Sequence, residues 1–124
     1  MARPSEHRPA SRPLSAEEAE ELAAAIALFG TASRLRLLWA MIDGERSVED
    51  LAAATELSES SASHQLRLLR EARLVAVRRD GRHAFYRLHD HHVPELLAAM
   101  RHHREHVQSS AAEEPTDALA TAGK

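Results

Sequence analysis

Residues 47–88 read SVEDLAAATELSESSASHQLRLLREARLVAVRRDGRHAFYRL. Ser47, with an acidic residue three positions later, is typical of a helix N-cap and predicts a short helix over 48–55. A three-residue turn follows, and Ser58 then caps a second helix over about 59–71. Two short helices joined in this way indicate a helix-turn-helix. The positions expected to face inward are Val48, Leu51, Ala52, Ala62, Leu66 and Leu69.

After this pair of helices the apolar pattern changes its period from 3.6 residues to 2. Residues 74–77 are expected to form a strand and residues 83–88 the returning strand. Between them, residues 78–82 are expected to form the hairpin turn, with Asp80-Gly81 at its tip. A helix-turn-helix followed by a hairpin predicts a winged helix, a mainly α fold with a β-hairpin wing.

Upstream, Ser15 with Glu18 forms a capping-box pattern that starts a first helix, which Gly30 ends. Thr31 is expected to cap a second helix over 32–42, and Asp43-Gly44 to form a turn. Two sets of apolar residues face one side of these helices. They are Leu22, Ile26 and Phe29 in the first, and Leu35, Leu38 and Trp39 in the second.

Downstream, Asp90 is expected to cap a last helix over 91–108, in which Pro94 is tolerated because it lies in the first turn. Val93, Leu96, Leu97 and Met100 lie along one face of this helix. No later element is available to cover this stripe. It therefore predicts a partner helix, most simply from a second copy of the chain.

Length and composition restrict the function classes further. The 124 residues suit one domain, with a folded part over 15–108, a disordered arm over 1–14 and a disordered tail over 109–124. There are no cysteines, which excludes disulfides, thiol catalysis and thiolate metal sites. No apolar run approaches the length of a membrane span or a signal peptide, so we expect a cytoplasmic protein.

The charge of the chain is unevenly distributed. Residues 61–88 hold seven arginines and two acids, a local charge of +5 in a chain whose net charge is −3. Such a block suggests contact with a polyanion such as DNA, although a solvated arginine-rich surface would show the same count. The hydroxyls and backbone N–H groups at the start of helix 59–71 suit phosphates and base edges. The candidate DNA contacts are Ser58, Ser60, Ser61, Ser63, His64, Gln65, Arg67, Arg78, Arg79 and Arg82.

Six of the nine histidines fall between residues 89 and 106, and four metal donors there form a pattern: Asp90, His92, His103 and His106. His92 and His103 face the same way because eleven residues make about three helical turns, but they are roughly 16 Å apart along the axis. One helix therefore cannot bring all four donors to one ion, whereas two antiparallel copies can. A carboxylate with three imidazoles suits tetrahedral zinc. The alternative is that these histidines form an ordinary polar surface.

An enzymatic alternative rests on residues 102–106, HHREH, which match the H-x-x-E-H pattern of a class of zinc proteases. That chemistry also needs a third ligand from a distant helix and a substrate cleft. A motif at the end of the last helix of a small chain offers neither. We therefore expect no catalysis.

Three motifs make residues 22–106 resemble the ArsR/SmtB family of metal-sensing repressors. They are LSESSASHQL at 57–66, GRHAFYRL at 81–88 and DHHV at 90–93, and the D-x-H-x10-H-x2-H spacing resembles that of the family's zinc sensors. The resemblance implies a homodimer through the first and last helices, which represses metal efflux or sequestration genes and releases operator DNA when it binds metal. It also implies that the ligand histidine at His103 donates a hydrogen bond to a backbone carbonyl just after the recognition helix, at the position of Arg73.

Two departures from the family reduce the number of metals that we expect to act as the inducer. The family's arsenic, cadmium and lead sensors use cysteines, which this chain lacks. Its nickel and cobalt sensors add further ligands, and here only His102 and His7 are spare, with His91 adjacent to the pattern. We therefore predict a zinc-responsive winged-helix repressor. A nickel- or cobalt-responsive repressor, or a DNA-binding dimer with structural histidines, remains the alternative.

Overall fold

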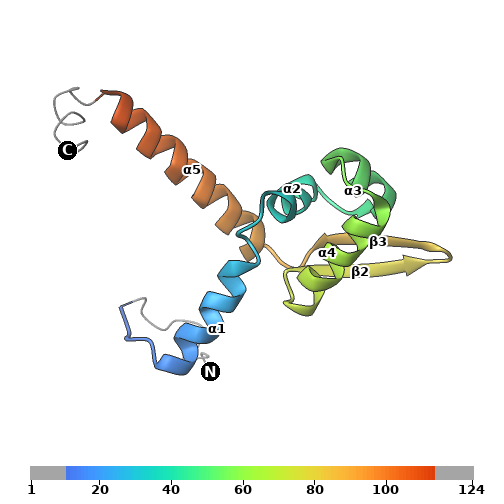
Figure 1. The fold of residues 1–124 in the computed structure, drawn as a ribbon, viewed down its shortest axis with the longest axis horizontal. Coiled ribbons are helices and arrows are strands. Elements are labelled where there is room, and N and C mark those ends of the chain that lie inside the picture. The colour runs from blue at the N-terminus through green and yellow to red at the C-terminus, as the bar shows by residue number, and fades with distance from the viewer. Residues whose placement is uncertain (1–10, 114–124) are drawn as a thin grey trace.

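The computed structural model describes residues 11–113, and it confirms the mainly α fold with a β-hairpin wing (Figure 1). Three central helices and the hairpin form the body, while the first and last helices extend from it. The elements in chain order are α1 (Ala16–Ala27), α2 (Ala32–Ala40), β1 (Arg46–Ser47), α3 (Val48–Thr55), α4 (Glu59–Glu71), β2 (Val75–Asp80), β3 (His83–Leu88) and α5 (His92–Glu113).

The helix-turn-helix formed by α3 and α4 has the predicted bounds. The Ser47 hydroxyl accepts the backbone N–H of Asp50 at 3.1 Å, and the Ser58 hydroxyl accepts that of Ser61 at 3.0 Å. Both caps satisfy N–H groups that have no partner within the helix. Glu56 ends α3 in the left-handed conformation, with φ of 60°, which turns the chain sharply toward α4. All six residues predicted to face inward are buried.

The wing differs in detail from the prediction. The strands continue through residues expected in the turn, so that Arg78 pairs with Phe85 and Asp80 with His83. The loop is only Gly81 and Arg82, with Gly81 at a φ of +62°, as a two-residue hairpin with glycine in its first loop position requires. The expected turn over 78–82 is therefore wrong, because the tighter loop lets the hydrogen-bonded ladder extend further.

A third strand, β1, was not predicted. Its two residues pair with β3, Arg46 with Tyr86 and Ser47 with Phe85, and the strand order is β1-β3-β2. Two residues are too few to show a period of 2, so this strand has no signal in the sequence. It attaches the wing to the start of α3.

The core is formed by buried residues from α2, α3, α4, the sheet and the start of α5. In α2 the prediction was correct for Leu38, but Leu37 is also fully buried, Leu35 is 39% exposed and Trp39 is half-buried. The reason is that α2 packs against α3 and α4. Leu35 and Trp39 instead line a groove with residues of α1 and α5.

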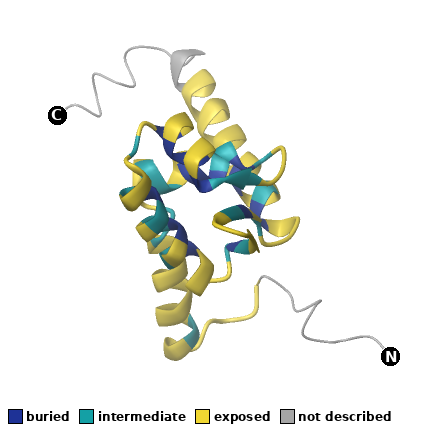
Figure 2. Ribbon diagram, turned by 90° about the vertical axis from the view of Figure 1, so that its right-hand side faces the viewer, coloured by how far each residue is buried: buried dark blue, intermediate teal, exposed yellow. Residues whose placement is uncertain are grey.

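The first and last helices are largely uncovered (Figure 2). No residue of α1 is buried, and Ile26 is 64% exposed. The predicted stripe of α5 is divided: Val93 and Leu97 are buried in the chain's own core, whereas Leu96 and Met100 are 48% and 64% exposed. The expectation that the whole stripe lacks cover within the chain was therefore wrong for two of its four residues.

The last helix is also longer than expected. It runs to Glu113, so the tail predicted from residue 109 is helical over 109–113. The remaining parts of the predicted arm and tail, residues 1–10 and 114–124, lie outside the described residues. Over 11–113, no single helix is long and apolar enough to cross a membrane; α1 and α2 meet those criteria only as a pair bent by 77°.

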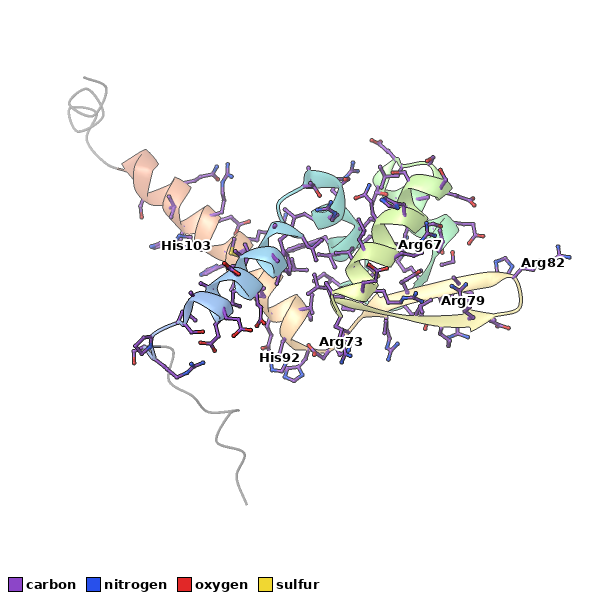
Figure 3. All side chains as sticks on the ribbon, turned by 60° about the horizontal axis from the view of Figure 1, so that its bottom comes forward. Arg67, Arg73, Arg79, Arg82, His92 and His103 are labelled. Carbon is purple, nitrogen blue, oxygen red and sulfur yellow. The ribbon has the colours of Figure 1, made fainter. Side chains whose placement is uncertain are left out.

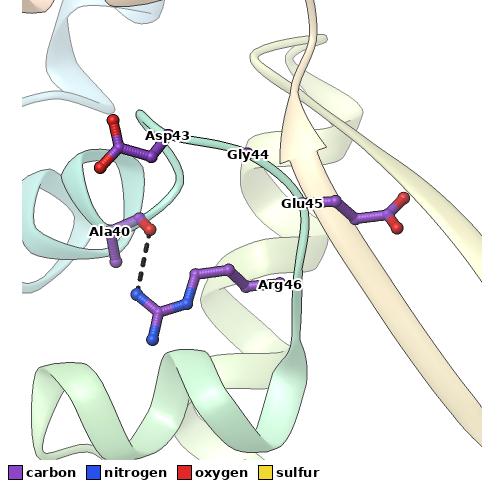
Figure 4. A pocket seen from close by; sticks show the side chains of 5 residues that line it. All are labelled: Ala40, Asp43, Gly44, Glu45 and Arg46. Carbon is purple, nitrogen blue, oxygen red and sulfur yellow. Dashed lines mark hydrogen bonds between the residues drawn. The ribbon is translucent and has the colours of Figure 1, made fainter.

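Two arginines donate hydrogen bonds to carbonyls at helix ends. Arg46 donates to the carbonyl of Ala40 at 3.2 Å, at the end of α2 (Figure 4). Arg36 donates to the carbonyl of Thr55 at 3.2 Å, at the end of α3. Cations at these positions satisfy carbonyls that lack helical partners and oppose the helix dipole. Both contacts hold the helix-turn-helix against α2.

Candidate DNA-binding surface and metal-ligand residues

One face of α4 is polar and exposed. Ser60, His64 and Arg67 follow one another at helical spacing and are exposed, on the side opposite the buried Leu66 and Leu69. Burial of the inner face thus holds this outer face at the surface of the body. Small and planar polar side chains on such a face can approach base edges and phosphates.

One residue predicted to contact DNA, Gln65, bonds to α2, and a second, Ser61, bonds to Gln65 within α4. Gln65 accepts a hydrogen bond from the Ser33 hydroxyl of α2 at 3.0 Å and donates to the Ser61 hydroxyl at 3.3 Å. Both Gln65 and Ser61 are half-buried, as is Ser63. Gln65 therefore joins the two helices, and the sequence pattern did not reveal this because its partner lies 32 residues away.

The wing lies beside α4 and carries the second group of predicted contacts (Figure 3). Arg79 and Arg82 are exposed, with Arg82 at the tip of the hairpin. Neither makes an ion pair within residues 11–113. Arg78 differs, because Glu45 binds its guanidinium at 2.8 Å and lowers the free positive charge of the wing. Together, Arg67, Arg79 and Arg82 supply an exposed cationic surface.

The first pair of predicted metal donors lies at the start of α5. Asp90 Oδ1 accepts the backbone N–H of His92 at 2.9 Å, as expected of a capping residue, and lies 3.3 Å from His92 Nδ1. His89 contributes a contact that the sequence analysis missed, its Nδ1 lying 3.2 Å from Asp90 Oδ2. The hydrogen bond with His89, and then the one from the His92 backbone, lower the pKa of Asp90. The carboxylate is therefore ionised, as a metal ligand must be.

The second pair, His103 and His106, lies one turn apart on the exposed outer part of α5. Figure 3 places His92 and His103 far apart along this helix. Within residues 11–113 of one chain, no three His, Asp or Glu side chains come together in a way that could hold a metal ion. Asp90 and His92 are thus in contact, His103 and His106 lie one helical turn apart, and the two pairs are separated along α5.

Arg73 lies in the turn between α4 and β2, with a left-handed φ of 63°. Figure 3 shows it beside the His92 end of α5 and away from His103 of the same chain. The backbone N–H of His89 donates to the carbonyl of the next residue, Leu74, at 3.0 Å. The turn after α4 is thus attached directly to the segment that carries Asp90 and His92.

Comparisons with known proteins agree with this arrangement. Residues 31–77 match the family described as "Bacterial regulatory protein, arsR family". The chain is 44% identical over 97 residues to a transcriptional repressor SmtB homolog from Synechocystis sp., covering 78% of this chain and 71% of that protein.

Two solved structures have the same fold. The homodimeric winged helix-turn-helix DNA-binding domain of a possible ArsR-family regulator from Mycobacterium bovis is 29% identical, with a TM-score of 0.68, covering 79% of this chain and 94% of that chain. The AntR antimony-specific transcriptional repressor is 30% identical, with a TM-score of 0.71, and the match covers 88% of this chain and 97% of that chain.

The cationic surface of the wing leads to a first prediction. Arg79→Ala should weaken binding to duplex DNA of any sequence and reduce the salt dependence of log K by about 0.9, because the protein then neutralises one phosphate fewer. Arg12→Ala, which removes an arginine before α1, serves as the control and should leave the slope unchanged. His64→Ala should instead change the preference among operator sequences. Fluorescence anisotropy at several salt concentrations measures all three, and unchanged DNA affinity in both Arg79→Ala and His64→Ala would contradict this DNA-binding surface.

Proposed function

Because this chain belongs to the ArsR family of bacterial transcriptional regulators, we propose that it is a metal-responsive repressor that releases its operator when zinc binds between two protomers. The observation that carries the proposal is the separation of two donor pairs along one largely uncovered helix, α5. Asp90 and His92 lie at its start, and His103 and His106 lie beyond its middle. We propose that α4 enters the major groove through Ser60, Ser63, His64 and Arg67, with the Ser58 end toward a phosphate. Arg79 and Arg82 of the wing would contact the neighbouring backbone.

A second copy of the chain is the proposed cover for α1 and α5. The exposed residues Leu96, Met100, His103 and Val107 are spaced by four, three and four positions, the spacing of a helix–helix seam. Beside this seam lies an apolar groove of about 620 Å³, lined by residues of α1, α2 and α5 that include Ile26, Leu35 and Trp39. An exposed apolar surface of this kind marks an interface. The homodimeric relative supports the choice of a second copy.

The dimer leads to a second prediction. Leu96→Glu places a charge in the proposed interface, whereas in the single protomer this side chain is exposed, so the variant should fold and be monomeric. Ala98→Glu is the matched control, because it adds the same charge to the opposite, exposed face of the same helix and should remain dimeric. Sedimentation equilibrium measures the mass, and circular dichroism the fold. A Leu96→Glu dimer as stable as the wild type would place the interface elsewhere.

The antiparallel arrangement of two α5 helices would complete the metal site. Asp90 and His92 of one protomer would lie near His103 and His106 of the partner subunit, giving two equivalent sites across a two-fold axis. The donor set fits zinc, because it contains three imidazoles, an ionised carboxylate and no thiolate. Cobalt-substituted protein distinguishes the alternatives, since intense d–d bands indicate four ligands and weak bands the six expected for nickel or cobalt sensing, with His91, His102 or His7 as further donors.

A third prediction tests whether the sites are shared between chains. A mixed dimer with Asp90→Ala in one chain and His103→Ala in the other should retain one intact zinc site, because both changes fall in the same cluster. The control dimer, with both changes in one chain and none in the other, should retain no intact site. Calorimetric titration with zinc gives the stoichiometry. Sites contained within one chain would give the reverse result.

The proposed signal passes from His103 to the turn that follows α4. Bound zinc would supply a fixed tautomer for the ligand imidazole, whose remaining N–H then needs an acceptor. The backbone carbonyl of Arg73 is the proposed acceptor, because this turn lies beside the donors at the start of α5. In an antiparallel dimer His103 of the partner subunit would approach the same place. Such a bond would hold the two α4 helices at a spacing unsuited to two half-sites.

Coupling between metal and DNA gives a fourth prediction. Zinc should weaken operator binding at fixed salt by at least tenfold, and DNA should weaken zinc binding by the same factor, about 1.4 kcal/mol or more. Added positive charge alone would act in the opposite direction. Protein with His103 methylated at its non-ligating nitrogen should bind zinc and yet keep its operator. An equal response in both proteins would contradict the hydrogen-bond route, and an unchanged wild type would contradict metal sensing.

A further inference from the structure

Arg78 makes the most extensive side-chain contact of the wing. From β2, its Nη2 donates to Glu45 Oε1 at 2.8 Å, and its Nε lies 3.1 and 3.2 Å from the two carboxylate oxygens. Glu45 stands in the loop between α2 and β1, 33 residues away in the chain. Two parallel hydrogen bonds between a guanidinium and a carboxylate are stronger and more directional than a single exposed ion pair.

The path of this side chain crosses the whole sheet. The strand order is β1-β3-β2, and Arg78 on β2 pairs with Phe85 on β3, which pairs with Ser47 on β1. The guanidinium carbon lies 4.6 Å from the centroid of the Phe85 ring, so the side chain passes over the central strand. It then reaches Glu45, which directly precedes β1 in the chain. The contact is therefore a clamp from one edge of the sheet to the other.

The position of Glu45 determines what the clamp holds. Arg46, the next residue, is bonded to the end of α2, and Figure 4 shows Glu45 directed toward the wing on the other side of this loop. Only two residues of β1 pair with the hairpin. Within residues 11–113, the other side-chain contact between the wing and a carboxylate outside it is longer, with His83 Nδ1 lying 3.6 Å from Glu49 Oε2. The base of the wing is held by the core, in which Val75 and Tyr86 are buried, and by packing on α3 and α4. The clamp adds a polar attachment further out on β2, at Arg78.

We propose that Arg78 is a positioning residue, which together with Glu45 and Phe85 holds the wing at the angle that lets Arg79 and Arg82 reach DNA. In this proposal Arg78 acts through Glu45, to which its Nε and Nη2 donate, rather than by contacting a phosphate itself. This inference rests on the DNA-binding part of the proposed function and is independent of the metal response.

The sign of the effect of Glu45→Ala tests the inference. If Arg78 acted directly on phosphate, removing Glu45 would free a cation, remove a negative charge and strengthen DNA binding. For a clamp, Glu45→Ala and Arg78→Ala should each weaken binding by a similar factor, roughly fivefold for a bidentate pair. The double variant should be no weaker than either single one. Anisotropy titrations of metal-free full-length protein measure these affinities.

Two further variants serve as controls. Asp43→Ala removes a carboxylate from the same loop, and in the part of the chain described Asp43 makes no ion pair, so it reports the general effect of the charge alone. Arg78→Lys keeps the charge but not the two-pronged hydrogen bonding, and a clamp predicts a loss of affinity close to that of Arg78→Ala. Amide hydrogen exchange over residues 75–88 should accelerate in Glu45→Ala, in Arg78→Ala and in Arg78→Lys.

Arg79→Ala is measured in the same titrations, so that the clamp at Arg78 and the proposed DNA contact of the wing are tested separately. Unchanged or stronger DNA binding in Glu45→Ala overturns the clamp, whatever the behaviour of Arg79→Ala. Weaker binding in Glu45→Ala with unchanged binding in Asp43→Ala supports it. If Arg79→Ala alone has no effect, the proposed phosphate contact of the wing is wrong, while a shared decrease in affinity in the two clamp variants still assigns Arg78 a positioning role.

Discussion

Burial of the inner face of α4 is the constraint on which the other features depend. Ala62, Leu66 and Leu69 are fully buried against the rest of the core. Truncating a buried leucine typically costs about 2–5 kcal/mol, a large part of the stability of a small domain. Because the inner face cannot leave the core, Ser60, His64 and Arg67 stay outside. The Ser33–Gln65 hydrogen bond then attaches α4 to α2. The periodicity of the sequence did not show which helix would lie on this side of α4.

The arginines have separate roles that a charge count conceals. Arg36 and Arg46 bind carbonyls at the ends of α3 and α2, and Arg78 binds the carboxylate of Glu45. Arg67, Arg79 and Arg82 remain exposed. The local charge of +5 in residues 61–88 therefore overstates the cationic surface, since Glu45, which neutralises one arginine, comes from outside that stretch. Arg70, Arg73 and Arg87 of the same stretch are also exposed. The remaining positive charge therefore extends over α4, the turn after it and the wing, where it can contact a polyanion.

The uncovered helices connect the two proposed activities. The buried part of α5 anchors it in the core through Val93 and Leu97, while Leu96 and Met100 extend the apolar surface outward. His103 lies within the same seam, so that a contact that covers the seam would also bring this donor to a second chain. The turn at Arg73 and the segment at Asp90 are attached through the His89–Leu74 backbone hydrogen bond. A change at the proposed metal site thus has a short covalent and hydrogen-bonded route to α4.

Local chemistry was enough to predict α3 and α4 with their bounds, because caps and apolar spacing act within a few residues. The same signals predicted the candidate donor pairs Asp90–His92 and His103–His106, since the two members of each pair are at most three residues apart in the sequence. They could not place Leu37 inside and Leu35 outside, because the burial of α2 depends on which helices pack against it. Nor could they reveal β1, the Gln65 contact or the partner of Arg78. These depend on groups between 32 and 40 residues apart that come into contact only when the chain folds. A local sequence pattern therefore cannot predict such contacts.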